Sequence, residues 1–262
     1  MKDVLSEIIA HKKIEVEAQK TKVSIQELEK SMEKLSRKPR SLKEALLQSE
    51  TGIIAEFKRK SPSKGWINQH AIAAEVVPEY EKNGAAAISV LTDTDFFGGS
   101  MEDLRTARGK VSVPLLRKEF IVDEYQIFEA KAHGADAILL IAAAISKHES
   151  LWFTKLARSV GLDVLLELHD KSEIDYISPD NNIVGINNRN LGSFVTDVKK
   201  SFNMIPFLPK EAVLVSESGI SHPQTVKELR KVGYKGFLIG ENFMKTQKPG
   251  ESLGAFMEKV IH

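Results

Sequence analysis

Short apolar runs rich in β-branched residues recur along the chain from residue 53 onward. Each run has the length of a strand and is apolar nearly throughout, which is typical of parallel strands that are covered on both faces. Eight strands are predicted in this way: Ile53–Phe57, Ala86–Leu91, Pro114–Arg117, Ala137–Ile141, Val164–Leu168, Ile183–Ile186, Ala212–Ser216 and Gly236–Ile239.

Stretches with apolar residues at helical spacing separate these runs. Several of them end at a glycine, such as Gly84 and Gly134, which is the residue that best tolerates the left-handed position after a helix. The predicted helices include Ala71–Asn83, Tyr125–His133, Leu151–Val160, Thr225–Val232 and Leu253–Ile261. The alternation of strands and helices predicts an α/β fold with a parallel sheet.

The number of strand–helix units distinguishes two α/β architectures. Eight units indicate a closed (β/α)8 TIM barrel, whereas a doubly wound sheet usually has about five to seven strands. A doubly wound sheet also carries a glycine-rich first turn, which is missing here. The alternative is an open α/β sheet in which one or two of the predicted strands are wrong.

The first fifty residues differ from the rest because they are charged, favour helices and contain almost no glycine. We predict two or three extra helices joined near Pro39, docked on the barrel and covering one of its ends; a solvated arm is the alternative. We expect one domain, residues 1–262, made of a helical extension (1–48) and a barrel (53–262). Apolar residues at helical spacing favour docking: Leu5, Ile8, Ile9, Leu42, Ala45 and Leu46.

Composition narrows the classes of ligand. The 37 Lys and Arg residues nearly balance the 36 Asp and Glu residues, which argues against a nucleic-acid or membrane partner held by bulk charge. The absence of cysteine excludes disulfides, zinc–thiolate sites, Fe–S clusters and a thiol nucleophile. No signal peptide and no apolar run of about 18 residues is found, so we expect a cytoplasmic protein.

Polar residues follow several predicted strands at positions of one parity. Because the site of a TIM barrel lies at the carboxyl ends of the strands, residues of that parity converge on one mouth if they face inward. Each of them alone could form a surface ion pair, but four strands that end in this way are hard to attribute to chance. The residues are Glu56, Lys58, Lys118, Glu167, Asn187, Arg189 and Glu217, with Ser216 and Ser218 on the other parity.

Two glycine-containing loops follow the last two strands, at Ser216–Ile220 and Gly236–Asn242. Loops in these two places, beside helix N-termini, form the common phosphate site of TIM barrels. Gly219 and Gly240 therefore predict phosphate binding, although each alone could mark a simple turn. The charge of Glu241 would repel the ligand unless its side chain points away and only its N–H is used.

Several motifs together resemble those of the indole-3-glycerol phosphate synthases, and the resemblance covers nearly the whole chain. The departures are small: Glu119 stands where Asp is frequent, and Glu241 where some members carry Ser. The motifs are IAEFKRKSPSKG at 54–65, SVLTD at 89–93, FGGS at 97–100, LRKEFI at 116–121, GINNRNL at 185–191 and SESGI at 216–220.

The resemblance implies a reaction on 1-(2-carboxyphenylamino)-1-deoxyribulose 5-phosphate: ring closure, loss of CO₂ and loss of water, without a cofactor or metal. It implies that Lys118 is the general acid on the carbonyl oxygen and Glu167 the base or partner acid in the dehydration. Glu56 would stabilise the charge that develops on the anilinium side, while Lys58 and Ser61 would anchor anionic groups. The division of labour between Lys118 and Lys58 stays open.

The resemblance also implies the binding residues. Asn187 and Arg189 would hold the hydroxyls and the carboxylate. Phe120, Leu139 and Leu191 would enclose the aromatic ring, and Ser218, Gly219, Gly240 and the N–H of Glu241 would bind the phosphate. A monomer is expected, and the extension together with the loop Arg59–Ile67 is expected to cover the ring pocket.

Two other functions are alternatives to this interpretation. A sugar-phosphate ketol isomerase of aromatic or histidine biosynthesis commonly pairs Cys with Asp, whereas this chain has no Cys and places Glu56 and Lys58 on the first strand. A non-catalytic phosphate-binding barrel would have no need for Lys118 and Glu167 on separate strands.

Overall fold

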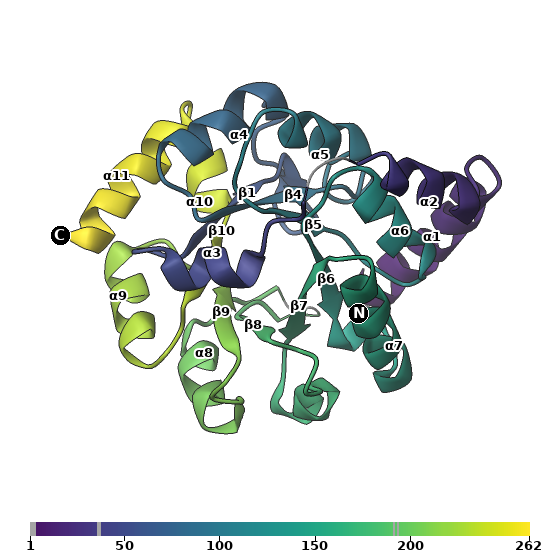
Figure 1. Cartoon of the computed structure of the whole chain (residues 1–262). Helices are drawn as coiled ribbons and strands as arrows, with labels where there is room; N and C mark the ends of the chain where they lie inside the picture. The colour runs from purple at the N-terminus through teal and green to yellow at the C-terminus, as the bar shows by residue number, and fades with distance from the viewer. Residues whose placement is uncertain (1–3, 36–37, 191, 193) are drawn as a thin grey trace.

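Eight parallel strands form a closed barrel in the computed structural model, which describes residues 4–35, 38–190, 192 and 194–262 (Figure 1). The barrel closes because β1 pairs with β4 on one side and with β10 on the other. The strands are β1 (Ile53–Phe57), β4 (Ala87–Leu91), β5 (Leu115–Lys118), β6 (Ala137–Ile141), β7 (Asp163–Leu168), β8 (Ile183–Asn187), β9 (Val213–Glu217) and β10 (Gly236–Ile239). The predicted TIM barrel is confirmed, and each strand begins and ends within one residue of its predicted bounds.

Helices surround the barrel (Figure 1). The helix α7 begins before the predicted Leu151 because Ser146 and Glu149 form a capping box. After β7 the connection contains a 3₁₀ helix, Lys171–Tyr176, where the other connections carry α-helices. The α-helices of the barrel are α4 (Ala73–Lys82), α5 (Met101–Arg108), α6 (Tyr125–Ala132), α7 (Lys147–Ser159), α8 (Lys199–Met204), α9 (Pro223–Lys231), α10 (Glu241–Met244) and α11 (Pro249–Ile261).

Alternate residues of each strand belong to two different cores. Ile53 and Leu115 pack in the layer between the strands and the outer helices. Ile54 and Leu116 pack in the second core, inside the barrel. Side chains alternate along a strand, so Glu56 and Lys118 share the inward direction of Ile54 and Leu116. The predicted inward parity of the polar strand ends is therefore confirmed.

The extension contributes helices to both ends of the barrel. Its first helix, α1 (Val4–Lys20), lies at the carboxyl ends of the strands, where Leu5 and Ile8 line the same cavity as Lys118. The helix α2 (Ile25–Glu33) packs on α6, where Leu28 and Val16 cluster with Tyr125. The chain thus passes down the outside of the barrel after α1.

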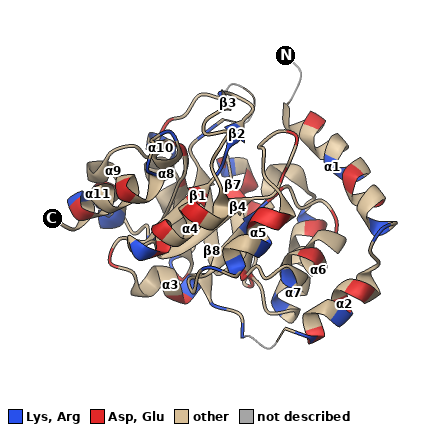
Figure 2. Ribbon diagram, turned by 90° about the horizontal axis from the view of Figure 1, so that it is seen from above, with Lys and Arg blue, Asp and Glu red and all other residues tan. Residues whose placement is uncertain are grey.

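The third helix, α3 (Leu42–Gln48), lies across the opposite end of the barrel, away from the hairpin of β2 (Lys60–Ser61) and β3 (Gly65–Trp66) (Figure 2). Just before α3, the N–H of Arg40 donates to Asp136, and within α3 the Leu46 side chain packs beside Gly236. Both Asp136 and Gly236 lie at strand starts. The prediction that the extension covers one end was incomplete, because α1 and α3 serve different ends.

The hairpin β2–β3 occupies the loop after β1 that was predicted to cover the site. Arg59 ties this loop to α5, because its guanidinium binds both carboxylate oxygens of Asp103, at 2.7 and 2.6 Å. Within the described ranges, no helix is both long enough and apolar enough to cross a membrane.

Candidate active site

A cavity of about 590 Å³ opens at the carboxyl ends of the strands, with walls from the strand ends, α1, the hairpin loop and the loops after β8, β9 and β10. Leu191 lies outside the described residues. Ser216, noted at the end of its strand, does not line this cavity. All the other residues to which the sequence gave a role in catalysis or binding do line it: Glu56, Lys58, Ser61, Lys118, Phe120, Leu139, Glu167, Asn187, Arg189, Ser218, Gly219, Gly240 and Glu241.

The floor of the cavity holds one ammonium between two buried carboxylates, Glu167 on β7 and Glu217 on β9, two strands that flank β8. The Nζ of Lys118 lies 3.0 Å from Oε2 of Glu167 and 3.7 Å from Oε2 of Glu217. Both carboxylates are about 1% exposed. His169 approaches from the other side, with its Nε2 3.2 Å from Oε1 of Glu167.

These neighbours set the protonation states on the floor. Burial alone would lower the pKa of Lys118, but the charges of Glu167, Glu217 and Glu56 outweigh it and hold that pKa above its ordinary value. Burial and the charge of Glu167 raise the pKa of Glu217 well above the ordinary range. The floor therefore holds a charged Lys118 and a carboxyl, Glu217, that resists ionisation.

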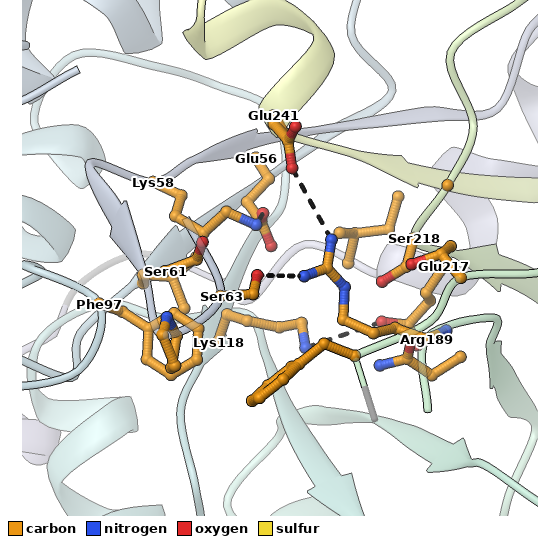
Figure 3. A pocket seen from close by; sticks show the side chains of 18 of the residues that line it. Glu56, Lys58, Ser61, Ser63, Phe97, Lys118, Arg189, Glu217, Ser218 and Glu241 are labelled. Atoms are coloured by element: carbon orange, nitrogen blue, oxygen red, sulfur yellow. Dashed lines mark hydrogen bonds and ion pairs between the residues drawn. The ribbon is translucent and has the colours of Figure 1, made fainter. Parts of the chain in front are cut away.

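A second ion pair lies at the end of β1 (Figure 3). The Nζ of Lys58 is 2.6 Å from Oε1 of Glu56, a residue that is 3% exposed. Nearby, Ser61 has a buried Oγ without a hydrogen-bond partner among the described residues. A buried hydroxyl without a partner costs free energy, so the cavity offers a polar ligand group a ready partner here.

Cations gather around Glu241 at the rim (Figure 3). Arg189 donates to Oγ of Ser63 at 2.6 Å, and its guanidinium lies 3.7 Å from Oε2 of Glu241. Lys64 lies 2.8 Å from the other oxygen of Glu241. Partial burial opposes ionisation, but the hydrogen bond from Lys64 and the charges of Lys58 and Arg189 lower the pKa of Glu241. Glu241 thus stays in the cavity wall as a paired carboxylate.

The loop after β9 has two successive residues in the left-handed region, Ser218 with φ 67° and Gly219 with φ 77°. A Cβ on Gly219 would lie 2.4 Å from Cγ2 of Thr196, so only glycine fits at that position. Asn188 supports the turn by donating to the carbonyl oxygen of Ser218 at 3.0 Å. The loop is fixed with Ser218 and Gly219 on the cavity wall, beside Gly240.

The remaining wall is apolar. The rings of Phe97 and Phe120 pack with their centroids 5.8 Å apart. Leu139 of β6 and Leu5 and Ile8 of α1 complete this side. The cavity therefore has an apolar side suited to a flat ring, a charged floor and a rim of backbone turns.

Comparison with known proteins agrees with this arrangement. The family model for indole-3-glycerol phosphate synthase matches residues 5–256. The chain is similar to the indole-3-glycerol phosphate synthase of Bacteroides thetaiotaomicron, with 55% identity over 99% of this chain and 100% of that protein. It is 43% identical to that of Aliarcobacter butzleri, over 97% of this chain and 98% of the relative.

The chain belongs to the indole-3-glycerol phosphate synthase family. It is therefore a carboxy-lyase of tryptophan biosynthesis, and its substrate is a sugar phosphate. The two other functions considered from the sequence, a ketol isomerase and a non-catalytic barrel, are set aside by this match.

Solved structures outside the family share only the barrel. One is a tryptophan synthase α-subunit from Pyrococcus furiosus, with a TM-score of 0.60, 15% identity and coverage of 81% of this chain and 98% of that one. Another is the 3-hexulose-6-phosphate synthase of Salmonella typhimurium, with a TM-score of 0.63 and 12% identity. The likeness covers 80% of this chain and 100% of that one. At such low identity the likeness supports the fold alone.

Three residues at the site were not among the sequence-predicted site residues: Glu217 and Phe97, which line the cavity, and His169, which lies beside Glu167. Glu217 was noted at the end of β9 but given no role, although its inward parity places it beside Lys118. His169 stands two residues after Glu167 and could have been found by the same parity. Phe97 lies in the FGGS motif after β4, but nothing in its spacing says that its ring turns into the cavity.

Proposed function

We propose that the cavity binds 1-(2-carboxyphenylamino)-1-deoxyribulose 5-phosphate and that Lys118 is the acid of its ring closure. The observation that carries the proposal is the position of the Lys118 ammonium, 3.0 Å from Glu167 on the cavity floor. The reaction develops negative charge on a carbonyl oxygen, and a fixed cation in a site shielded from water stabilises such a charge strongly.

The proposed orientation follows the polarity of the walls. The aromatic ring lies against Phe120 and Leu139, with Leu191 also expected on this side. Asn187 and Arg189 hold the hydroxyls and the carboxylate, and Lys58 and Ser61 anchor anionic groups. The phosphate lies at the rim on backbone groups, at Ser218, Gly219, Gly240 and the N–H of Glu241.

Ring closure joins the ring carbon that bears the carboxylate to C2′ of the sugar. The electron pair of the carbonyl moves to its oxygen, and Lys118 donates a proton there to give a hydroxyl. Glu56, paired with Lys58, stabilises the positive charge that the anilinium side acquires. CO₂ then leaves, and the electrons of the broken C–C bond restore the aromatic ring.

Dehydration completes the indole. The hydroxyl on C2′ leaves as water after it takes up a proton, and Glu167 accepts the proton lost from C1′. In the dehydration the substrate takes up one proton on the hydroxyl and loses one from C1′, so the net change is zero. Ring closure with decarboxylation takes up one proton from the protein. Lys118 must therefore regain a proton from solvent in each turnover, which its raised pKa favours.

The test is turnover of this substrate by the purified protein, followed by indole fluorescence without added cofactor or metal. Lys118→Met should lose about 10²–10⁴-fold in kcat, because it removes both the proton donor and the fixed charge. Circular dichroism of the variant should match that of the wild-type protein. A kcat within a few-fold of wild type would remove Lys118 from the mechanism.

We also propose that the protein acts as a monomer. The support is that the residues proposed to bind and convert the substrate all belong to one chain, so that a complete site does not need a residue from a second copy. Light scattering at micromolar concentration should give the mass of one chain, 29.2 kDa, and a dimer mass would contradict this proposal. The expected cytoplasmic location stays a prediction.

A further inference from the structure

The helix α1 carries a lysine that is almost fully buried. Lys12 is 1% exposed, and its Nζ lies 2.8 Å from Glu15, 2.9 Å from Asp93 and 3.2 Å from Glu119. Burial opposes the charge, but Glu119 and Asp93 outweigh it and raise the pKa of Lys12 above its ordinary value. Lys12 is therefore an ammonium buried among carboxylates, outside the proposed machinery.

Two of these carboxylates also hold the backbone of the aromatic wall. Asp93 uses its Oδ1 to accept the N–H of Phe96 at 2.8 Å and that of Phe97 at 3.1 Å, while Lys12 binds its Oδ2. Glu119 uses its Oε1 to accept the N–H of Phe120 at 2.8 Å, and Lys12 approaches that same oxygen.

The other partners of these carboxylates do not replace Lys12. Glu119 accepts from Oγ1 of Thr92 at 2.8 Å and has Arg117 at 3.9 Å. Asp93 has no cation within 4 Å other than Lys12 in the part of the chain that the structure describes. Lys12 is thus the one described cation that bridges the two carboxylates, and so the two loops that carry Phe97 and Phe120.

We propose that Lys12 is a positioning residue for the aryl group of the substrate, because it fixes Phe97 and Phe120 through Asp93 and Glu119. The inference rests on the proposed placement of the aromatic ring against this wall. It gives the extension a specific task at the cavity: one side chain of α1 sets the spacing of two rings that come from different loops.

Lys12→Met should therefore weaken binding of the aromatic part of the ligand and leave the phosphate site intact. We expect KM for the substrate and Kd for the product, indole-3-glycerol phosphate, to rise about tenfold, which equals about 1.4 kcal/mol. Inhibition by inorganic phosphate should stay within about twofold of wild type. Lys12→Arg keeps the cation and should restore most of the product affinity.

Lys20→Met is the matched control. Lys20 lies on the same helix and also reaches the barrel, where its Nζ is 2.7 Å from Asp123, but it holds no aromatic residue of the wall. This variant should keep wild-type KM and product affinity. If Lys12→Met is insoluble, Lys12→Gln, which keeps a polar amide but no positive charge, should show the same selective loss of product affinity.

The outcomes separate this inference from the proposed function. Phe97→Ala and Phe120→Ala should each weaken product binding; if neither does, the ring placement is wrong and the inference fails with it. If they do, but Lys12→Met binds product like wild type, the positioning role is wrong. Equal loss of product and phosphate affinity would also overturn it. Lys12 would then stabilise the fold in general and not the aromatic wall in particular.

Discussion

Gly240 and Glu56 lie so close together that a Cβ on the glycine would be 2.3 Å from Oε1 of the carboxylate. Gly240 ends the loop after β10, and Glu56 lies on the neighbouring strand β1. The sequence predicted a phosphate role for this glycine. The structure adds a second constraint, since only a residue without a side chain leaves room for the Glu56 carboxylate in its pair with Lys58.

Gly240→Ala should therefore reduce kcat and not only phosphate affinity. The added methyl group displaces Glu56, and the misplacement of one group at a reacting centre can cost about 10²-fold. Steady-state kinetics would give both constants. Gly109→Ala is the control, because a Cβ at Gly109 meets its nearest atom at an ordinary 3.5 Å. A rise in KM alone would show that Glu56 adjusts without harm.

Glu167→Gln should reduce kcat by about 10²–10⁴-fold with little change in KM, because it removes a proton acceptor and keeps the shape. It also removes the nearest negative charge from Lys118, so the pKa of Lys118 should fall. Glu211→Gln, an exposed change outside the cavity lining, serves as the control. An effect confined to KM would mean that Glu167 only binds substrate.

Glu217→Gln should stabilise the fold at alkaline pH. Because the folded-state pKa of Glu217 is raised from 4.5, its contribution to stability is complete below that value and is lost as pH rises through the folded pKa. Glutamine does not titrate, so the stability of the variant relative to the wild-type protein should increase as pH rises. Melting temperatures of both proteins at pH 5 and pH 8 would check this. The prediction is contradicted if the melting temperature of the variant minus that of the wild-type protein is smaller at pH 8 than at pH 5.

Glu241→Ser should lower KM for the phosphorylated substrate by about threefold to tenfold. Glu241 is ionised beside the proposed phosphate site, and a like charge near 4 Å costs about 1 kcal/mol even in water. The change also releases Lys64 and Arg189. The gain should shrink at high salt, where exposed charges are screened. An unchanged KM at low salt would show that the Glu241 charge does not reach the ligand.

Strand parity explains why much of this site was readable from sequence. Ile54 and Leu116 point into the barrel, and residues two positions apart on a strand share a face. Glu56 and Lys118 therefore also point inward, at the mouth. The same alternation places Glu167 and Asn187 there. The strand order does not by itself predict the Lys118–Glu167 ion pair, because β6 lies between β5 and β7 and the two side chains meet across the mouth.

Contacts between distant segments were not readable. Nothing in the helical spacing of α1 and α3 shows that they pack at opposite ends of one barrel. Lys12 looks like any charged residue of an amphipathic helix, and its burial depends on Asp93 and Glu119, which lie far along the chain. The pairing of Glu241 with Lys64 and Arg189 likewise depends on how two loops fold back over the mouth.

The separation of α1 and α3 has a consequence for the order in which the chain is made. Ribosomes release the N-terminal segment first, yet Lys20 pairs with Asp123, 103 residues later, and Ser41 with Asp163, 122 residues later. β1 lacks one of its two neighbouring strands for longer still, because that strand is β10, the last one to be synthesised. The earliest part of the nascent chain thus stays without these partners until the middle of the chain has been made, and the mouth and floor are completed only after barrel closure becomes possible.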